Sequence, residues 1–230
     1  MRLRISGSAV VAAVLTATLG AALALATITP IQPSNYPPGC SPQPGAKADQ
    51  GNGANDSMVG TALNDVLKGG GGRDSISGLQ GNDCLYGEKG RDRIFGRFGS
   101  DYISGGVSRD ILRGNSGADR MLGGKGLDSI YGNLGNDRLN GGPASDALNG
   151  GGGNDRLIGR TGDDRLIARG GNDRLKGGDG VDVLNGGVGN DLLVGGRGAD
   201  MIRCGDGSDV ARAKGGDTVS GDCEAVILVD

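Results

Sequence analysis

The sequence contains no histidine and no tryptophan, and aromatic residues make up only 3% of its 230 residues. Without histidine, the chain lacks the commonest general base of enzymes and the commonest ligand of transition metals. With so few large side chains, it cannot fill the core of a conventional globular domain of this length. Its 24 basic residues are outnumbered by 27 acidic ones, which argues against a nucleic-acid-binding protein.

Glycine is the residue in excess, with 50 copies in the chain. Collagen carries a glycine at every third residue, and the spacing here is different. Disordered chains combine few apolar residues with a high net charge, whereas this chain is 36% apolar and has a net charge of −3. The class that remains is a tightly turning repeat.

The N-terminus has the features of an export signal. Arg2 and Arg4 precede an apolar stretch, residues 9–25, which ends in the small-x-small sequence Ala24-Leu25-Ala26. This pattern predicts a secretory signal peptide over residues 1–26, and therefore a secreted, extracellular protein, with cell-surface association left open. The alternative is a membrane anchor, which the interruption of the apolar stretch by threonines and Gly20 disfavours. After cleavage we expect no membrane span. Residues 27–50 are predicted to be a Pro/Ser-rich leader.

An aspartate recurs at every ninth residue over most of the chain. An aliphatic or methionine side chain stands two residues after each of these aspartates, except at Ala211 in the last repeat. A glycine stands five residues before each, except at Ala168 and Cys204. The aspartates in this register are Asp56, Asp65, Asp74, Asp83, Asp92, Asp101, Asp110, Asp119, Asp128, Asp137, Asp146, Asp155, Asp164, Asp173, Asp182, Asp191, Asp200 and Asp209.

The nine-residue unit has the composition of a sharp turn followed by a short strand. Glycines let the backbone take positive φ in the turn, and the apolar residue points inward between two outward neighbours. Because one repeat cannot bury its apolar residue, the repeats must stack. Two repeats make one flattened coil, so the 18 repeats predict an all-β fold: a parallel β-roll, or β-solenoid, of about nine coils over residues 51–212. Residues 213–230 are predicted to form a C-terminal cap.

Stacking places every second aspartate in one column, with carboxylates about 4.8 Å apart. Like charges at this distance repel by about 1 kcal/mol even in water, so the chain is expected to fold poorly without a counter-ion. Calcium is a hard cation that takes about six to eight oxygen ligands, and carboxylates and backbone carbonyls are what such a stack offers. The sequence therefore predicts that multiple Ca²⁺ ions bind, with all eighteen aspartates as ligands, and that the chain folds on binding calcium after export.

Stretches such as Gly150-Gly151-Gly152-Gly153-Asn154-Asp155-Arg156-Leu157 follow the pattern G-G-x-G-x-D-x-U, where U is a large apolar residue. Over residues 51–212 the sequence thereby resembles the RTX, or haemolysin-type, calcium-binding nonapeptide repeat. The resemblance implies a right-handed parallel β-roll with calcium between the turns, bound by the aspartate carboxylate and by carbonyls at the second and fourth repeat positions. In the six fully matching repeats these carbonyls belong to Gly70, Gly72, Gly124, Gly126, Gly151, Gly153, Gly178, Gly180, Gly187, Gly189, Gly196 and Gly198. Repeats with a side chain there, such as Ala54 or Leu63, are expected to bind weakly.

Members of this family usually attach the repeats to a protease, lipase or toxin domain, which this sequence does not show, so we expect no enzyme. The expected role is structural or adhesive. One alternative is a polysaccharide-modifying enzyme on a β-solenoid, which would need acids, bases and aromatics clustered away from the repeat register. Another is an ice-binding solenoid, which would need ranks of threonine on a flat face.

Four cysteines in an exported protein predict two disulfides, with three possible pairings. Cys204 and Cys223 flank the point at which the nine-residue register breaks. We predict the pairs Cys40–Cys84 and Cys204–Cys223, so that each bridge fixes an end coil. The apolar tail, residues 225–229, is predicted to cover the last coil.

Four arginines recur at 18-residue spacing, which would stack them on one face: Arg120, Arg138, Arg156 and Arg174. They are interpreted first as a solvated strand face that offsets the aspartate columns. The alternative is a docking stripe for an acidic polysaccharide or cell-wall polymer.

Overall fold

The computed structural model describes residues 43–229, so the predicted signal peptide and most of the predicted leader lie outside the described residues. Their fold is all-β, as predicted, and its strands lie in two parallel sheets. One sheet contains β1 (Ala48–Gln50), β3 (Val66–Gly72), β5 (Cys84–Gly90), β7 (Tyr102–Val107), β9 (Arg120–Lys125), β11 (Arg138–Pro143), β13 (Arg156–Thr161), β15 (Arg174–Asp179), β17 (Leu192–Arg197), β19 (Val210–Ala213) and β21 (Ala225–Leu228). The other contains β2 (Ser57–Val59), β4 (Ser75–Gln80), β6 (Arg93–Phe98), β8 (Ile111–Ser116), β10 (Ser129–Leu134), β12 (Ala147–Gly152), β14 (Arg165–Gly170), β16 (Val183–Val188), β18 (Met201–Asp206) and β20 (Thr218–Val219).

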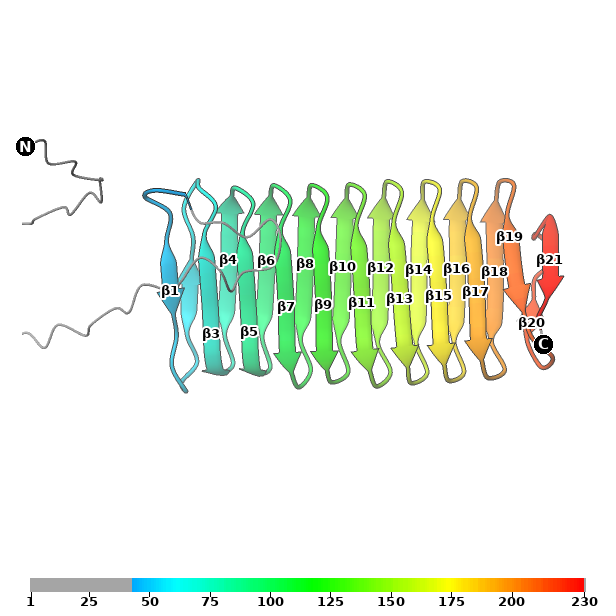
Figure 1. Ribbon diagram of the computed structural model, residues 1–230, viewed down its shortest axis with the longest axis horizontal. Helices are drawn as coiled ribbons and strands as arrows, with labels where there is room; N and C mark the ends of the chain where they lie inside the picture. Colours follow the sequence, from blue (N-terminus) through cyan, green and yellow to red (C-terminus); the bar gives the residue numbers. More distant parts are fainter. Residues whose placement is uncertain (1–42, 230) are drawn as a thin grey trace, which may run out of the picture. The chain divides into compact units, whose positions relative to one another are not determined.

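Each strand pairs with the strand two places further along the chain, so the backbone winds as a parallel β-solenoid (Figure 1). From β1 to β19 the register between neighbouring strands of one sheet is 18 residues, as in the pair Leu85 and Ile103. This is twice the repeat length, which confirms that two repeats make one coil. Among the described residues there is no helix with the length and apolar character that a membrane crossing requires.

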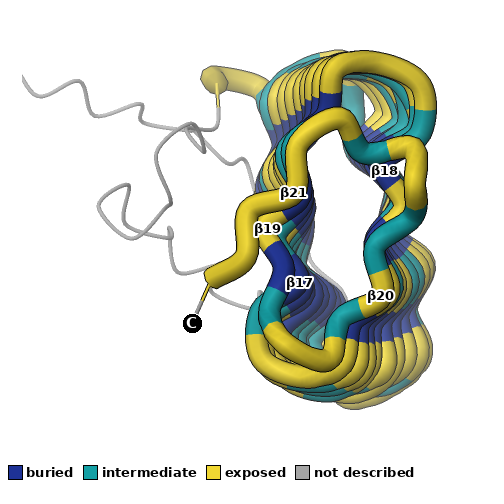
Figure 2. Tube along the Cα trace, turned by 90° about the vertical axis from the view of Figure 1, so that its right-hand side faces the viewer, coloured by how far each residue is buried: buried dark blue, intermediate teal, exposed yellow. Residues whose placement is uncertain are grey.

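The core is a single column of side chains between the two sheets. The apolar residue two positions after each aspartate is buried in every repeat, from Met58 to Ala211. Seen along the stack, buried residues lie along the two long sides of each coil, and the turns lie at its two narrow ends (Figure 2). The period of two in the strands therefore positions one apolar residue inside each half-coil.

The solenoid has about ten turns, one more than the sequence predicted, because strands form at both ends of the repeat register. β1 precedes residue 51 and pairs with β3, and β20 and β21 lie beyond residue 212 and pair with β18 and β19. The apolar tail was expected to cover the last coil. It forms β21, which pairs with β19, and Val226 and Leu228 in this strand are exposed by 47% and 78%.

The predicted disulfide Cys204–Cys223 is confirmed, with the two α-carbons 5.1 Å apart. It ties β18 to the segment that precedes β21. Cys84 is also disulfide-bonded. Its predicted partner, Cys40, lies outside the described residues.

Candidate metal site

The aspartates of the repeat form two buried columns, one at each narrow end of the coils. We number the positions of each repeat so that the aspartate is position 6. The strand begins immediately after it, so the aspartate side chain points to the same inner side as the apolar residue at position 8. Seventeen of the eighteen aspartates, Asp65 to Asp209, are at most 3% exposed, and Asp56 at the start of the series is half-buried.

One carboxylate oxygen of each buried aspartate is used by the backbone. The amide of an aspartate donates a hydrogen bond to Oδ1 of the aspartate one coil later, with N to Oδ1 distances of 2.6–2.9 Å. Sixteen such bonds run without interruption from Asp56 to Asp209. The side chains therefore continue the sheet ladder into the turns.

The second carboxylate oxygen has no partner. Oδ2 is buried and accepts no hydrogen bond in Asp74 and in every later aspartate of the register up to Asp209. Burying an unpaired polar atom destabilises a fold, and a buried carboxylate costs more than a neutral group. Sixteen buried carboxylate oxygens without a hydrogen-bond partner indicate that a positively charged group is needed beside them.

The space in front of Oδ2 exists because position 1 is glycine. A Cβ on Gly105 would lie 2.5 Å from Oδ2 of Asp110 and 2.6 Å from the carbonyl oxygen of Gly123 in the next coil. A Cβ on Gly123 would meet the equivalent oxygens of Asp128 and Gly141 at the same distances. Each glycine at position 1 therefore leaves an empty space that a carboxylate oxygen and a backbone carbonyl oxygen both face.

Burial raises the pKa of these carboxyl groups, because the charged form loses its hydration. The pKa of Asp101 and of Asp110 rises from 3.8 to about 8, and that of Asp119 to about 7. Repulsion from the neighbouring aspartates of the same column adds to this effect at Asp101 and Asp110, and the backbone hydrogen bond opposes it. Without a cation, several of these groups would hold a proton at neutral pH.

The twelve glycines whose carbonyls were predicted as ligands all have positive φ, as at Gly124 (105°) at the end of β9 and Gly126 (144°) just after it. A Cβ on Gly126 would collide with the carbonyl of Ser108, one coil earlier. Carbonyl groups at positions 2 and 4 therefore point along the stack toward the next coil. A Cβ at position 1 would meet both Oδ2 and the position-1 carbonyl of the next coil, so position-1 carbonyls are further candidate donors, which the sequence pattern alone did not indicate.

The two ends of the aspartate series differ from its middle. Oδ2 of Asp56 accepts a hydrogen bond from the amide of Asn52, and Oδ2 of Asp65 accepts one from the amide of Thr61, so neither oxygen is unpaired. At the other end, two residues that the sequence reasoning missed extend the columns. The carboxylate of Asp217 accepts a hydrogen bond from the amide of Asp200, and the carboxylate of Glu224 accepts one from the amide of Asp209. Their separations of 17 and 15 residues break the period of 18, which is why the repeat did not reveal them.

Calcium fits this donor set. Unpaired carboxylate oxygens next to backbone carbonyls, without nitrogen or sulfur donors, are the ligands that a hard divalent cation takes. Oδ2 of the aspartates from Asp74 to Asp200, apart from Asp173, would hold the ion, together with carbonyls of the adjoining turns. When bound, it would supply the positive charge that the buried columns lack. Ala168 and Cys204 are fully buried at position 1, so the repeats of Asp173 and Asp209 lack the free space.

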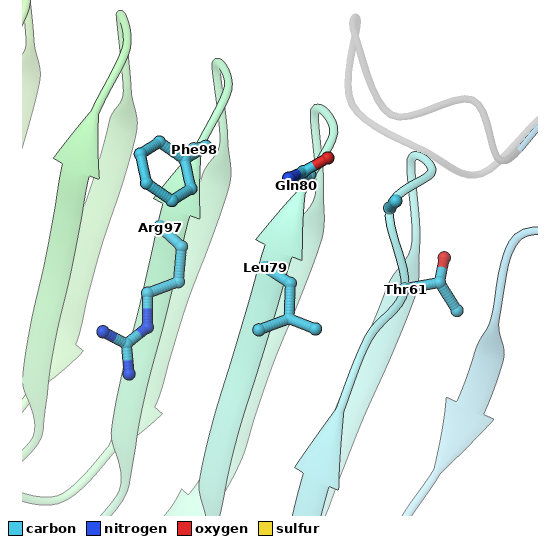
Figure 3. Close-up of a pocket in the computed structure, with 6 residues that line it drawn as sticks. Thr61, Leu79, Gln80, Arg97 and Phe98 are labelled. Atoms are coloured by element: carbon cyan, nitrogen blue, oxygen red, sulfur yellow. The ribbon is translucent and has the colours of Figure 1, made fainter.

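The surface also has an open hollow of about 490 Å³ beside β4 and β6. Figure 3 shows Thr61, Leu79, Gln80, Arg97 and Phe98 around it. Its lining includes one arginine and one aromatic ring but no carboxylate. It does not have the acids and bases that were named as the mark of a polysaccharide-modifying enzyme.

A family model described as the RTX calcium-binding nonapeptide repeat (4 copies) matches the chain at residues 50–85, 78–112, 113–148, 140–175, 149–184 and 176–211. Together these matches span residues 50–211, more than two thirds of the chain. No curated protein matches the sequence. The matched segment is the one that forms the stacked coils with their two aspartate columns, and the chain belongs to the RTX calcium-binding nonapeptide repeat family.

Proposed function

We propose that this protein is an extracellular, non-catalytic module that folds when calcium fills its aspartate columns and then serves a structural or adhesive role. The observation that carries the proposal is the unpaired Oδ2 of sixteen buried aspartates. Family membership supports calcium as the ion. The export signal predicted at residues 1–26 supports folding outside the cell.

The energetics favour folding that depends on the ion. The single core column offers about 1.5–3 kcal/mol per buried apolar side chain, against roughly 1.5 kcal/mol of ordering entropy per residue. The buried carboxylates add a further cost in the absence of calcium. A site whose dissociation constant lies about tenfold below the free calcium concentration contributes about 1.4 kcal/mol, so many sites together decide the balance.

The proposal is tested by stripping calcium with a chelator and following far-UV circular dichroism while calcium is added, with magnesium as the control. We expect a cooperative transition from coil to β-structure near roughly millimolar calcium and none with magnesium, since Mg²⁺ gives up its water shell reluctantly. A β-rich spectrum that ignores both chelator and calcium would refute the proposal.

The predicted arginine column supports a partner for the adhesive role. Arg120, Arg138, Arg156 and Arg174 lie opposite one another on successive strands from β9 to β15. We propose that this column docks an acidic polysaccharide or cell-wall polymer whose negative charges recur along the chain. Replacing all four arginines with serine should abolish salt-sensitive binding to such polymers, and unchanged binding would rule the column out.

A further inference from the structure

A second group of arginines surrounds a hollow at one narrow end of the coils, where the turns lead into β4, β6 and β8. Arg73, Arg91 and Arg109 occupy position 5 in three successive coils, and Arg93 is the first residue of β6. The hollow measures about 350 Å³ and is also lined by Asp74, Ser75, Asp92 and Ile111. It lies at the turns, apart from the arginine column of the other sheet.

None of these four guanidinium groups forms an ion pair. Among residues 43–229 the ion pairs are Lys47–Asp49 and Arg197–Asp179. Asp74 and Asp92 line the hollow, but Oδ1 of each accepts a backbone amide and Oδ2 of each is buried. Four positive charges therefore face one hollow without an ion pair, and the electrostatic attraction of Arg109 to Asp128 acts over a longer distance.

Position 5 carries a different residue type at the opposite narrow end. There the side-chain oxygens of four asparagines accept a hydrogen bond from the amide of the position-5 residue in the next coil, at 2.7–2.8 Å: Asn82, Asn136, Asn154 and Asn172. Arginine has no acceptor atom and cannot make this bond. Stacked arginines also repel one another, so three in succession are unfavourable for the stack itself. Three stacked arginines that neither make this hydrogen bond nor favour stacking indicate a role other than folding.

The surrounding surface also favours an anionic ligand. Seventeen of the acidic residues are buried in the two columns. The surface of residues 43–229 therefore carries 22 basic side chains against nine acidic ones, although the net charge of the whole sequence is −3. An anion that approaches the folded solenoid meets an excess of positive charge.

We propose that Arg73, Arg91, Arg93 and Arg109 form a binding site for a sulfate or phosphate group carried on a sugar. The guanidinium group is planar and donates paired hydrogen bonds that match the oxygens of such a tetrahedral anion. The stacking of three arginines at intervals of about 4.8 Å allows one anionic group to contact two coils. The site needs only the folded stack, so it does not rest on the role proposed for calcium.

The test uses the folded chain in calcium and measures binding by calorimetry with three probes: sucrose octasulfate, glucose 1,6-bisphosphate and trigalacturonate. The site variant combines the three substitutions Arg73→Ser, Arg91→Ser and Arg109→Ser in one chain. The control variant, Lys125→Ser, Arg165→Ser and Arg203→Ser, makes the same change of charge at three separated exposed positions. Circular dichroism verifies that both variants keep the β-structure.

We expect the sulfated or the phosphorylated probe to bind, and the site variant to lose at least about tenfold in affinity while the control loses less than about threefold. Whichever of the two probes binds identifies the source of the anionic group. Equal losses in the two variants would overturn the site in favour of general charge attraction. Binding of trigalacturonate as tight as that of the other probes would overturn the ligand class, and absence of binding by all three would overturn the proposal.

Discussion

At the scale of single residues, the aspartate of each repeat has two tasks. Oδ1 extends the backbone ladder from one coil to the next, and Oδ2 stays free for a cation. The two tasks place a charge in the interior that only a bound ion or a proton can neutralise. The stability of the protein should therefore depend on both calcium and pH.

The metal-free chain should lose stability as pH rises. Burial raises the pKa of Asp101 and Asp110 to about 8 and of Asp119, Asp146 and Asp155 to about 7, from 3.8. A group with a raised folded-state pKa contributes stability that is complete below about pH 4 and is lost as the pH passes through the raised values. In chelator, β-structure followed by far-UV circular dichroism should therefore be greatest near pH 4 and be lost as the pH rises to about 8.

With calcium the trend should reverse, because the ion binds deprotonated carboxylates. Titrations that follow β-structure at several pH values should show that less calcium is needed at pH 8 than at pH 6. A metal-free protein whose β-structure increases from about pH 4 to about pH 8 would contradict the assignment of buried, unneutralised carboxyls.

The change Asp110→Asn should have opposite effects with and without calcium. Asparagine keeps the Oδ1 acceptor for the amide of Asp92 but removes the charge. In calcium the variant should lose about 1–2 kcal/mol of unfolding free energy through its weakened site, and in chelator it should gain roughly 1 kcal/mol. Urea denaturation measures the effect in calcium, and the pH at which the metal-free chain loses its β-structure measures the effect in chelator.

Asp163→Asn is the matched control. Asp163 is exposed, and its Oδ1 also accepts a backbone amide, that of Val181. It should change the unfolding free energy by less than about 0.5 kcal/mol in either condition. If Asp110→Asn behaves in the same way, Oδ2 of Asp110 is not a calcium ligand.

At the scale of one turn and its strand, the glycine at position 1 maintains the space in front of the carboxylate. The backbone φ of this glycine is not positive. Glycine is therefore required there because a side chain would not fit, and not because of the backbone conformation. Positions 2 and 4 differ, since their glycines adopt positive φ. The repeat thus uses glycine for two separate reasons within four residues.

Gly105→Ala should destabilise the protein by roughly 1–3 kcal/mol and raise the calcium needed for folding, because its Cβ would press on Asp110 and Gly123. Gly170→Ala is the control, since a Cβ there meets nothing within 4 Å. The measurement is the urea midpoint at fixed calcium for both variants. Equal stability of the two would show that position 1 has room for a side chain.

The sequence predicted the elements well wherever the nine-residue period holds. Leu85 and Ile103 are buried neighbours in register, as the spacing required. It did not predict Asp217 and Glu224 as column members, because their register depends on the local path of the last coil. The sequence also did not indicate that Oδ1 of each aspartate accepts a hydrogen bond from a backbone amide. This bond follows from the direction of the amide at the start of each strand.

At the scale of the solenoid, folding separates charges of opposite sign. The repeat aspartates go inside and the basic residues stay outside, so a sequence with a small negative charge presents a basic surface. Calcium would neutralise the interior and leave this surface charge unbalanced. The unfolded chain mixes both signs along its length.

The calcium-bound protein should therefore bind to a cation exchanger at neutral pH, even though its formal net charge is −3. In chelator the chain should pass through the same column, because its aspartates are then available to offset the arginines. The salt concentration at elution, compared between calcium and magnesium buffers, measures the difference. Equal elution in all three buffers would contradict the separation of charge.

The central claim is that calcium occupies the space between Oδ2 and the carbonyls at both ends of each coil. A crystal structure of the protein grown in calcium tests it directly. We predict cation density next to Oδ2 in the repeats from Asp74 onward that have glycine at position 1, and none at Asp173 and Asp209, where Ala168 and Cys204 fill the space. Folded coils with water or no density beside these oxygens would contradict the claim.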